Sequence, residues 1–163
     1  LTNVVSNEYG TAMTNPTSHL DDFLPYLLST ASNAVSDVIA HEYRHRFGLK
    51  IPEWRVMAVL GDRGQLTQRE LVRATLMDKV TVNRATKALD DRKLINRLPN
   101  HSDGRSHLLI LSETGRELYD VIMPAARNTE AQIMRALSQS EREELARILL
   151  LVRKSAETIL DAE

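Results

Sequence analysis

The sequence of 163 residues predicts a mainly α-helical fold with a small β-hairpin, and three observations support this prediction. Long stretches near both ends place apolar residues three and four positions apart, which is the period of an amphipathic helix. Two strand-like runs, residues 94–98 and 107–111, flank a turn rich in Asn, Ser, Asp and Gly. Before this hairpin, Thr and Asp residues at capping positions predict two short helices.

Basic charge is concentrated in the middle of the chain. Residues 63–107 carry 10 Lys and Arg against 5 Asp and Glu, whereas residues 1–62 and 108–163 each have a net charge of −3. A basic centre between acidic flanks is typical of a protein whose middle contacts phosphate. The alternative is chance clustering on a solvated surface.

Composition excludes several other classes of protein. The chain has no cysteine, which excludes disulfides, thiol catalysis and cysteine-ligated zinc and fits a reducing cytoplasm. No run of 18 apolar residues is present, so we expect no membrane partner. Neither a nucleophile–base constellation nor a phosphate-binding glycine loop indicates an enzyme, and no motif calls for a cofactor.

The N-terminal part is expected to consist of a flexible arm followed by a long helix. Residues 1–21 are polar and contain Gly10 and Pro16. A helix is predicted over about residues 22–47, with Gly48 as its C-terminal stop. Its apolar stripe is Leu24, Leu27, Leu28, Ala31, Val35, Val38 and Ile39.

The string His41-Glu42-Tyr43-Arg44-His45 in this helix matches the H-E-x-x-H pattern of zinc hydrolases. Such an enzyme also needs a third ligand and a substrate cleft. The other histidines lie in the arm and near the hairpin turn, at His19, His101 and His107. The histidines of the string are therefore expected to be polar residues beside the stripe or in a pocket, with a regulatory zinc site as the alternative.

Three further helices are predicted before the hairpin. The first runs from Pro52, at its first position, to about Asp62. The second begins at Thr67, where Thr67 and Glu70 form a capping box, and its Leu71 and Leu76 are expected to point inward. The third has Asp78 as its N-cap.

The helix after Asp78 has two different faces. At 100° per residue, one face carries residues suited to a core: Val82, Ala85, Thr86 and Leu89. The opposite face carries Val80, Asn83, Arg84 and Lys87, with Thr81 and Lys79 on its flanks. Arg and Lys can donate to guanine, Asn can pair with adenine, and Val or the Thr methyl can touch a thymine methyl. This pattern favours insertion into the major groove over an ordinary solvated face.

The hairpin completes a winged helix-turn-helix, which is a device for reading duplex DNA. An Arg at the tip of such a hairpin, here Arg105, can enter the narrow and electronegative minor groove. Asp103 would meet repulsion from phosphate if it pointed outward alone, so we expect it to hold Arg105 or the loop.

The last third of the chain is predicted to be helical. Ser112 caps a helix that runs to about Leu137 and is kinked at Pro124, and a capping box at Ser140-Glu141-Arg142-Glu143 opens the final helix. The apolar stripe of this final helix is Leu145, Ile148, Leu149, Val152, Ala156, Ile159 and Leu160. The terminal helices offer more apolar surface than a small winged domain can cover, which favours a two-fold homodimer on a palindromic site.

Residues 23–160 resemble the multiple antibiotic resistance regulator (MarR) family. The most specific part is Asp103-Gly104-Arg105, a hydrophobic strand over residues 107–111, and then Ser112-Glu113-Thr114-Gly115, which is similar to the wing signature of the family. Residues 68–71 and 81–84 resemble the two helices of its helix-turn-helix. One departure is Lys93, which stands where the family usually has Gly and would have to adopt a left-handed backbone conformation.

The resemblance implies a cytoplasmic homodimeric regulator, most often a repressor, whose DNA affinity falls when a small molecule binds. It implies one domain over residues 22–163, with a winged helix-turn-helix at about 52–111 and dimerisation helices at about 22–47 and 112–161. The expected partner is double-stranded DNA carrying a pseudo-palindromic operator. Effectors in the family are commonly aromatic acids, phenolics or related thioesters, including coenzyme A thioesters. A constitutive or metal-sensing regulator is the alternative.

Two sets of site residues follow from the helix faces and the resemblance. The expected DNA contacts are Gln68, Arg69, Lys79, Val80, Thr81, Asn83, Arg84, Lys87, Arg97, Asp103 and Arg105. The expected pocket residues, chosen by their place in the chain, are His41, His45, Arg46, Trp54, Met57 and Tyr119.

Overall fold

The computed structural model describes residues 19–161. The predicted arm, residues 1–21, lies outside the described residues except at its end, where η1 (Leu20–Asp22) forms a single 3₁₀ turn. A boundary after Asn33, within α1 (Leu24–Phe47), separates two compact units. Of the first unit, the structure describes η1 and the start of α1, where the apolar side chains of Leu24, Leu27 and Leu28 are exposed.

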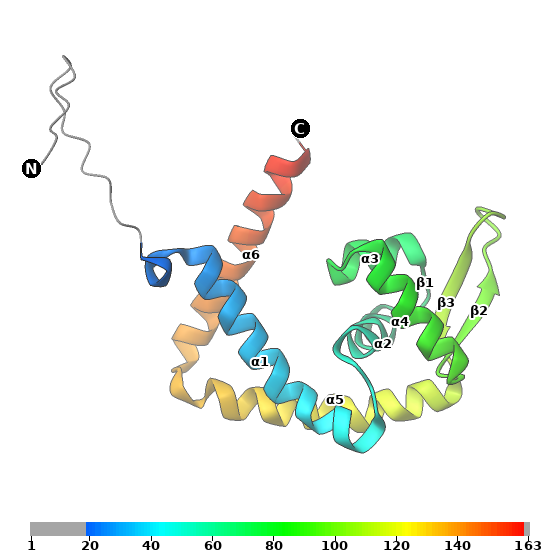
Figure 1. Ribbon diagram of the computed structural model, residues 1–163, viewed down its shortest axis with the longest axis horizontal. Coiled ribbons are helices and arrows are strands. Elements are labelled where there is room, and N and C mark those ends of the chain that lie inside the picture. Colours follow the sequence, from blue (N-terminus) through cyan, green and yellow to red (C-terminus); the bar gives the residue numbers. More distant parts are fainter. Residues whose placement is uncertain (1–18, 162–163) are drawn as a thin grey trace, which may run out of the picture. The chain divides into compact units, whose positions relative to one another are not determined.

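The second unit contains the predicted winged helix-turn-helix. In chain order, this motif consists of α2 (Ile51–Arg63), β1 (Leu66–Thr67), α3 (Gln68–Thr75), α4 (Lys79–Asp91), β2 (Ile95–Pro99) and β3 (His107–Leu111) (Figure 1). The strands form an antiparallel sheet in the order β1-β3-β2. The hairpin register pairs Ile95 with Leu111 and Pro99 with His107.

Local signals explain most of these helix boundaries. Thr67 caps α3 by accepting the Glu70 N–H at 3.3 Å, while the Glu70 carboxylate accepts the Thr67 N–H at 2.7 Å. This is the reciprocal box that the sequence predicts. Pro52 stands at the second position of α2, one later than predicted, because the helix begins at Ile51.

Two features of the helix-turn-helix differ from the predictions. Leu76 does not point inward: it follows α3 with a left-handed φ of 54° and its side chain is 65% exposed. Helical periodicity fails at this residue because the helix has already ended. The sheet also contains β1, a third strand that the sequence analysis missed, since only its pairing with β3 defines this short segment.

One apolar core lies beneath α3, α4 and the wing. Fully buried side chains from five elements and from the α1–α2 connection meet there, and they are Leu49, Val56, Met57, Leu60, Leu71, Val82, Leu89, Leu109 and Ile122. The predicted inner face of α4 is confirmed, because Val82, Ala85, Thr86 and Leu89 are all buried. Packing of this face fixes which side of α4 is turned to the solvent.

The C-terminal part consists of α5 (Glu113–Ile133), the 3₁₀ turn η2 (Met134–Ala136) and α6 (Gln139–Asp161). Ser112 caps α5 as predicted, since its hydroxyl accepts the Gly115 N–H at 3.0 Å, and the helix continues through Pro124. The capping box of α6 was assigned to the wrong serine. Ser138 and Glu141 form it, with the Ser138 N–H donating to the Glu141 carboxylate at 2.7 Å.

The apolar stripe predicted for α6 is exposed. Its members from Leu145 to Leu160 include Ile148 and Leu149, both 43% exposed, and Leu150 beside them is 66% exposed. None of the described helices combines the length and apolar character needed to cross a membrane.

Candidate DNA-binding surface

Helix α4 presents its polar face to solvent. Lys79, Asn83, Arg84 and Lys87 are exposed, and Val80 among them is 59% exposed. The opposite face is buried in the core, so the backbone beneath these side chains is held rigidly. A helix whose outer face is exposed, basic and hydrogen-bonding has the chemistry that base edges in a major groove require.

The start of α4 is fixed by Asp78 and Thr81. The Asp78 carboxylate accepts the Thr81 N–H at 2.8 Å and also the Thr81 hydroxyl, which orients the Thr81 side chain. Hydrogen bonds from the hydroxyl and N–H of Thr81 hold the pKa of Asp78 below its ordinary value. The negative charge also lies at the positive end of the helix dipole.

Neutralising Asp78 should therefore weaken this helix start. A lowered folded-state pKa contributes stability above the unfolded pKa of about 3.9, and this contribution is lost as the pH falls through the folded value. We expect Asp78→Asn to lower the Tm at pH 7 and the difference from wild type to shrink below pH 4. Thermal unfolding followed by circular dichroism measures this. Asp91→Asn, at the other end of α4, is the control and should not lower the Tm; equal Tm values for Asp78→Asn and wild type at pH 7 would contradict the assignment.

The two helices of the motif are linked by one side-chain hydrogen bond. The Gln68 amide on α3 donates to the Asn83 side-chain oxygen on α4 at 3.1 Å. This bond leaves the Asn83 amide N–H groups free, so Asn83 is set to donate to an acceptor such as a purine N7. The bidentate pairing with adenine that the sequence suggested would use the second lone pair of the oxygen that already accepts from Gln68.

The tip of the wing is braced by its own polar groups. The Asp103 carboxylate accepts the backbone N–H of Arg105 at 3.1 Å, and the backbone oxygen of Asp103 accepts the N–H of Ser106 at 3.0 Å. Asn100 donates to the Ser106 hydroxyl at 2.7 Å. Asp103 thus orders the loop through the backbone, while the Arg105 side chain is exposed.

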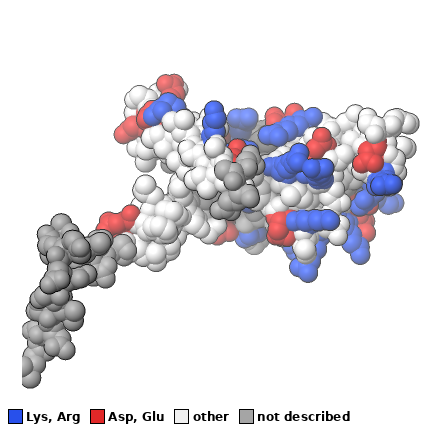
Figure 2. Space-filling model, turned by 90° about the horizontal axis from the view of Figure 1, so that it is seen from above, with Lys and Arg blue, Asp and Glu red and all other residues white. Residues whose placement is uncertain are grey.

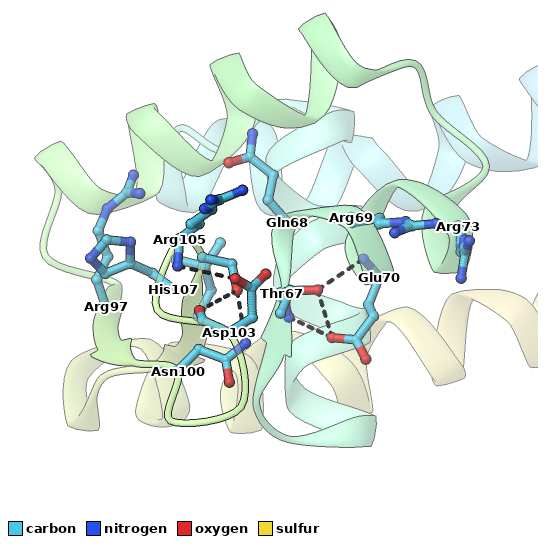
Figure 3. Close-up of a pocket in the computed structure, with 12 residues that line it drawn as sticks. Thr67, Gln68, Arg69, Glu70, Arg73, Arg97, Asn100, Asp103, Arg105 and His107 are labelled. Atoms are coloured by element: carbon cyan, nitrogen blue, oxygen red, sulfur yellow. Dashed lines mark hydrogen bonds between the residues drawn. The ribbon is translucent and has the colours of Figure 1, made fainter.

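A hollow of about 520 Å³ lies between the start of α3 and the wing (Figure 3). Four arginines line it: Arg69, Arg73, Arg97 and Arg105. Figure 3 shows Arg105 and Arg97 on the wing side, and Arg69 and Arg73 further along α3. Arg97 is also paired with Asp90 of α4 at 2.7 Å, which ties β2 to that helix.

Several side chains that line this hollow were not among the predicted DNA contacts, and Arg73, Asn100 and His107 are three of them. Arg73 lies on α3 beyond the segment that resembles the family. Asn100 and His107 occupy the two ends of the wing loop, where no helix wheel applies. Only the folded arrangement, which brings α3 against the wing, groups them with Arg69 and Arg105.

The charge on this part of the surface is mainly positive. Figure 2 shows Lys and Arg side chains crowded over the region that contains α3, α4 and the wing, with acidic side chains between them. Three acidic side chains of α3, α4 and the turn between them, Glu70, Asp78 and Asp90, are committed to caps or an ion pair. The basic side chains on the α4 face are thus the groups left to meet an anionic partner.

The six expected pocket residues do not gather in one cavity. Met57 is fully buried in the core. Trp54 borders a hollow of about 420 Å³ and its ring stacks on that of Tyr119, with centroids 6.1 Å apart. His41 lines a second hollow with Asp37 and Gln132, and Arg46 lines a third with Arg92.

The histidines of the H-E-x-x-H string are neighbours on the surface of α1. The rings of His41 and His45 have centroids 4.7 Å apart, and both side chains are exposed. Tyr43, between them, is buried in the core. Among the described residues, no group of three His, Asp or Glu side chains could hold a metal ion. The pair therefore has no third ligand within that part of the chain.

The fold and this surface together define a winged helix-turn-helix protein of the kind that reads duplex DNA. A family model described as MarR family matches residues 47–106. The MarR family transcriptional regulator SPO1453 of Silicibacter pomeroyi is 30% identical with a TM-score of 0.70, over 83% of this chain and 98% of that one. The chain belongs to the MarR family of transcriptional regulators, which leaves no enzymatic role for the H-E-x-x-H string.

Two further relatives are informative. The chain is similar to the transcriptional repressor NicR of Pseudomonas putida, with 34% identity over 98 residues, and the match spans 60% of each protein. It is also similar to BpsR of Bordetella bronchiseptica, whose DNA binding is regulated by 6-hydroxynicotinic acid. That structure has 25% identity and a TM-score of 0.72, over 85% of this chain and 96% of that one.

Proposed function

We propose that this protein is a homodimeric repressor that reads a pseudo-palindromic operator and releases it when a small aromatic acid or its thioester binds. The observation that carries the proposal is the exposed Arg, Lys and Asn face of α4, anchored by a buried opposite face beside a basic wing. Val80, Asn83, Arg84 and Lys87 would lie in the major groove. Arg105 would enter the minor groove, and Gln68, Arg69 and Lys79 would meet phosphates.

Replacing Arg84 and Arg105 separately tests this division of roles. Loss of a base contact is expected to weaken operator binding by roughly 5- to 150-fold for Arg84→Ala, and to reduce discrimination at one base position. Arg105→Ala should weaken binding more evenly across sequences. Fluorescence anisotropy with operator and scrambled duplexes at fixed salt measures both effects.

A matched control is Arg135→Ala, which removes the same charge from η2, away from the α4 face and the wing. It should leave the ratio of operator to scrambled-DNA affinity unchanged. Wild-type operator affinity in both Arg84→Ala and Arg105→Ala would show that the reading surface is assigned wrongly.

Dimerisation is supported by the apolar side chains that the single chain leaves exposed on α6. Pairing with a second copy would bury them and place two α4 helices in successive major grooves, about 34–36 Å apart. An isologous dimer of this kind matches a palindromic operator.

For the effector we propose the hollow beside Trp54. Its walls are mostly apolar, from Val35, Ile39, Ala58, Met123, Ala126 and Met134. Trp54 offers an aromatic surface, and the charged groups at the hollow are Arg127 and Glu130. This combination suits a flat ring whose carboxylate pairs with Arg127 and whose N–H or O–H donates to Glu130. The ligand named for BpsR, 6-hydroxynicotinic acid, has both groups and is the first probe to use.

A thermal-shift screen of aromatic acids and their coenzyme A thioesters would identify the effector, since a bound ligand stabilises the folded protein. For a carboxylate ligand we expect Arg127→Ala to weaken binding by about 10- to 100-fold, which corresponds to losing one charge-assisted pair. Arg46→Ala and His41→Ala, in the other two hollows, are the matched controls and should bind normally. Loss of binding in a control but not in Arg127→Ala would move the effector to another hollow.

A further inference from the structure

Arg92 joins the end of α4 to the junction between α1 and α2. It follows the last residue of α4, and its own N–H donates to the Ala88 carbonyl at 3.2 Å. Its guanidinium reaches across the fold. Nη2 donates to the Phe47 carbonyl at 2.7 Å and Nη1 donates to the Gly48 carbonyl at 3.3 Å.

The end of α1 presents two backbone carbonyls that can accept hydrogen bonds from this guanidinium. Gly48 adopts a left-handed φ of 63°, with its N–H bonded to the Arg44 carbonyl. This turn leaves the carbonyls of Phe47 and Gly48 outside the helical ladder, at the negative end of the helix dipole. A cation that donates to both carbonyls satisfies them and is stabilised by the dipole.

We call the contact of Arg92 with the α1–α2 connection the Arg92 joint. A buried carboxylate adds to this contact. Glu53, near the start of α2, is 6% exposed and accepts the Lys50 N–H at 2.9 Å. The Arg92 guanidinium lies 4.0 Å from this carboxylate. A carboxylate buried to this degree needs a compensating charge, and Arg92 provides it.

We propose that Arg92 is a positioning residue for operator recognition, and that its guanidinium fixes the C-terminal end of α4 on the α1–α2 junction. The proposal rests on the proposed function, in which α4 reads the operator. The other end of α4 is held by Asp78 and by the Gln68–Asn83 bond. Because the helix is about 20 Å long, loosening one end would displace base-reading groups by more than a hydrogen bond tolerates.

Arg92 acts through α4 and not through a phosphate. Its guanidinium is occupied by the α1 carbonyls, and it is absent from the residues that line the hollow between α3 and the wing. A phosphate contact and a positioning contact therefore predict different salt dependence. Losing a phosphate contact reduces the slope of log affinity against log salt by about 0.9, whereas losing a positioning contact leaves that slope unchanged.

The experiment compares the full-length Arg92→Ala, Arg92→Lys and Lys93→Gly proteins on operator and scrambled duplexes over a range of salt. Lys93→Gly is the matched control, because it removes the neighbouring charge at a left-handed φ of 57° that glycine adopts freely. For Arg92→Ala we expect operator affinity to fall about tenfold, the size of one lost base contact, with scrambled-DNA affinity and salt slope as in Lys93→Gly. Arg92→Lys, a single-point donor, should lie between Arg92→Ala and wild type.

Three results would overturn the inference: an unchanged ratio of operator to scrambled-DNA affinity in Arg92→Ala, a salt slope reduced by about 0.9 relative to Lys93→Gly, or no recovery in Arg92→Lys. If Arg92→Ala does not fold, Glu53→Gln replaces it. That variant removes a negative charge, which by itself would favour DNA binding. Weaker operator binding by Glu53→Gln therefore supports the inference, and unchanged or tighter binding overturns it. Failure of the proposed function looks different, because wild type itself would then not discriminate any operator from scrambled DNA.

Discussion

Replacing Leu149 and Val152 together with glutamate is expected to give a folded monomer with at least about 100-fold weaker operator affinity. The two side chains are 43% and 46% exposed in the single chain, so the fold of one copy loses little when they become polar. In the proposed dimer they would be buried, and four glutamates would then face one another in the interface. A monomer contacts one half-site and loses the effective concentration that the second half-site supplies. Analytical ultracentrifugation and anisotropy titrations measure the two effects.

The control adds the same number of charges to the opposite side of α6. At 100° per residue, Ser140 and Thr158 lie away from the apolar stripe, so Ser140→Glu with Thr158→Glu should remain dimeric and bind normally. A dimeric Leu149→Glu, Val152→Glu protein would show that another surface holds the two copies together.

Sequence patterns predicted the features of this fold that depend on neighbouring residues. The caps at Thr67, Asp78 and Ser112 each join groups within three positions of one another, so the pattern alone identifies them. The buried face of α4 follows from helical periodicity in the same way. Lys93 also adopts the left-handed conformation required of it, with φ 57°.

Where two nearby residues could each cap the same helix, the sequence did not indicate which one does. Ser138 and Ser140 each have Glu three residues later, and the structure uses Ser138 because Leu137 is extended and the helix begins at once after that serine. The prediction that Leu76 points inward was wrong for a related reason, since helical periodicity does not show where a helix ends.

Contacts between segments far apart in the chain could not be predicted from the sequence. The hollow between α3 and the wing brings Arg73 to Asn100 and His107, and the Arg92 joint spans 45 positions along the chain to Phe47. The predicted pocket residues were chosen by position in the chain. In the structure His41, Trp54 and Arg46 line three different hollows, and Met57 lies in the core. Such groupings depend on how helices pack, which no local pattern encodes.

Gly115→Ala is expected to destabilise the protein by about 3 kcal/mol, although alanine normally favours a helix by about 1 kcal/mol over glycine. Gly115 lies in the first turn of α5, and a Cβ there would stand 1.9 Å from the carbonyl oxygen of Leu94 and 2.9 Å from its carbonyl carbon. Those atoms are backbone, so they cannot rotate away. The Leu94 carbonyl also accepts the Ser112 N–H at 3.0 Å, which joins the start of β2 to the start of α5. A side chain at this residue would therefore separate the base of the wing from α5, and urea denaturation would show a lower midpoint.

Gly104→Ala is the matched control, because a Cβ at the wing tip would meet no atom within 4 Å and should leave the urea midpoint close to that of wild type. The closing glycine of the wing signature is then explained by a close backbone approach and not by a need for an unusual φ, since Gly115 is helical. A Gly115→Ala protein as stable as Gly104→Ala would mean that β2 and α5 are not packed this closely. A destabilised one that still binds operator at low temperature would separate the role of Gly115 in stability from the role of α4 in recognition.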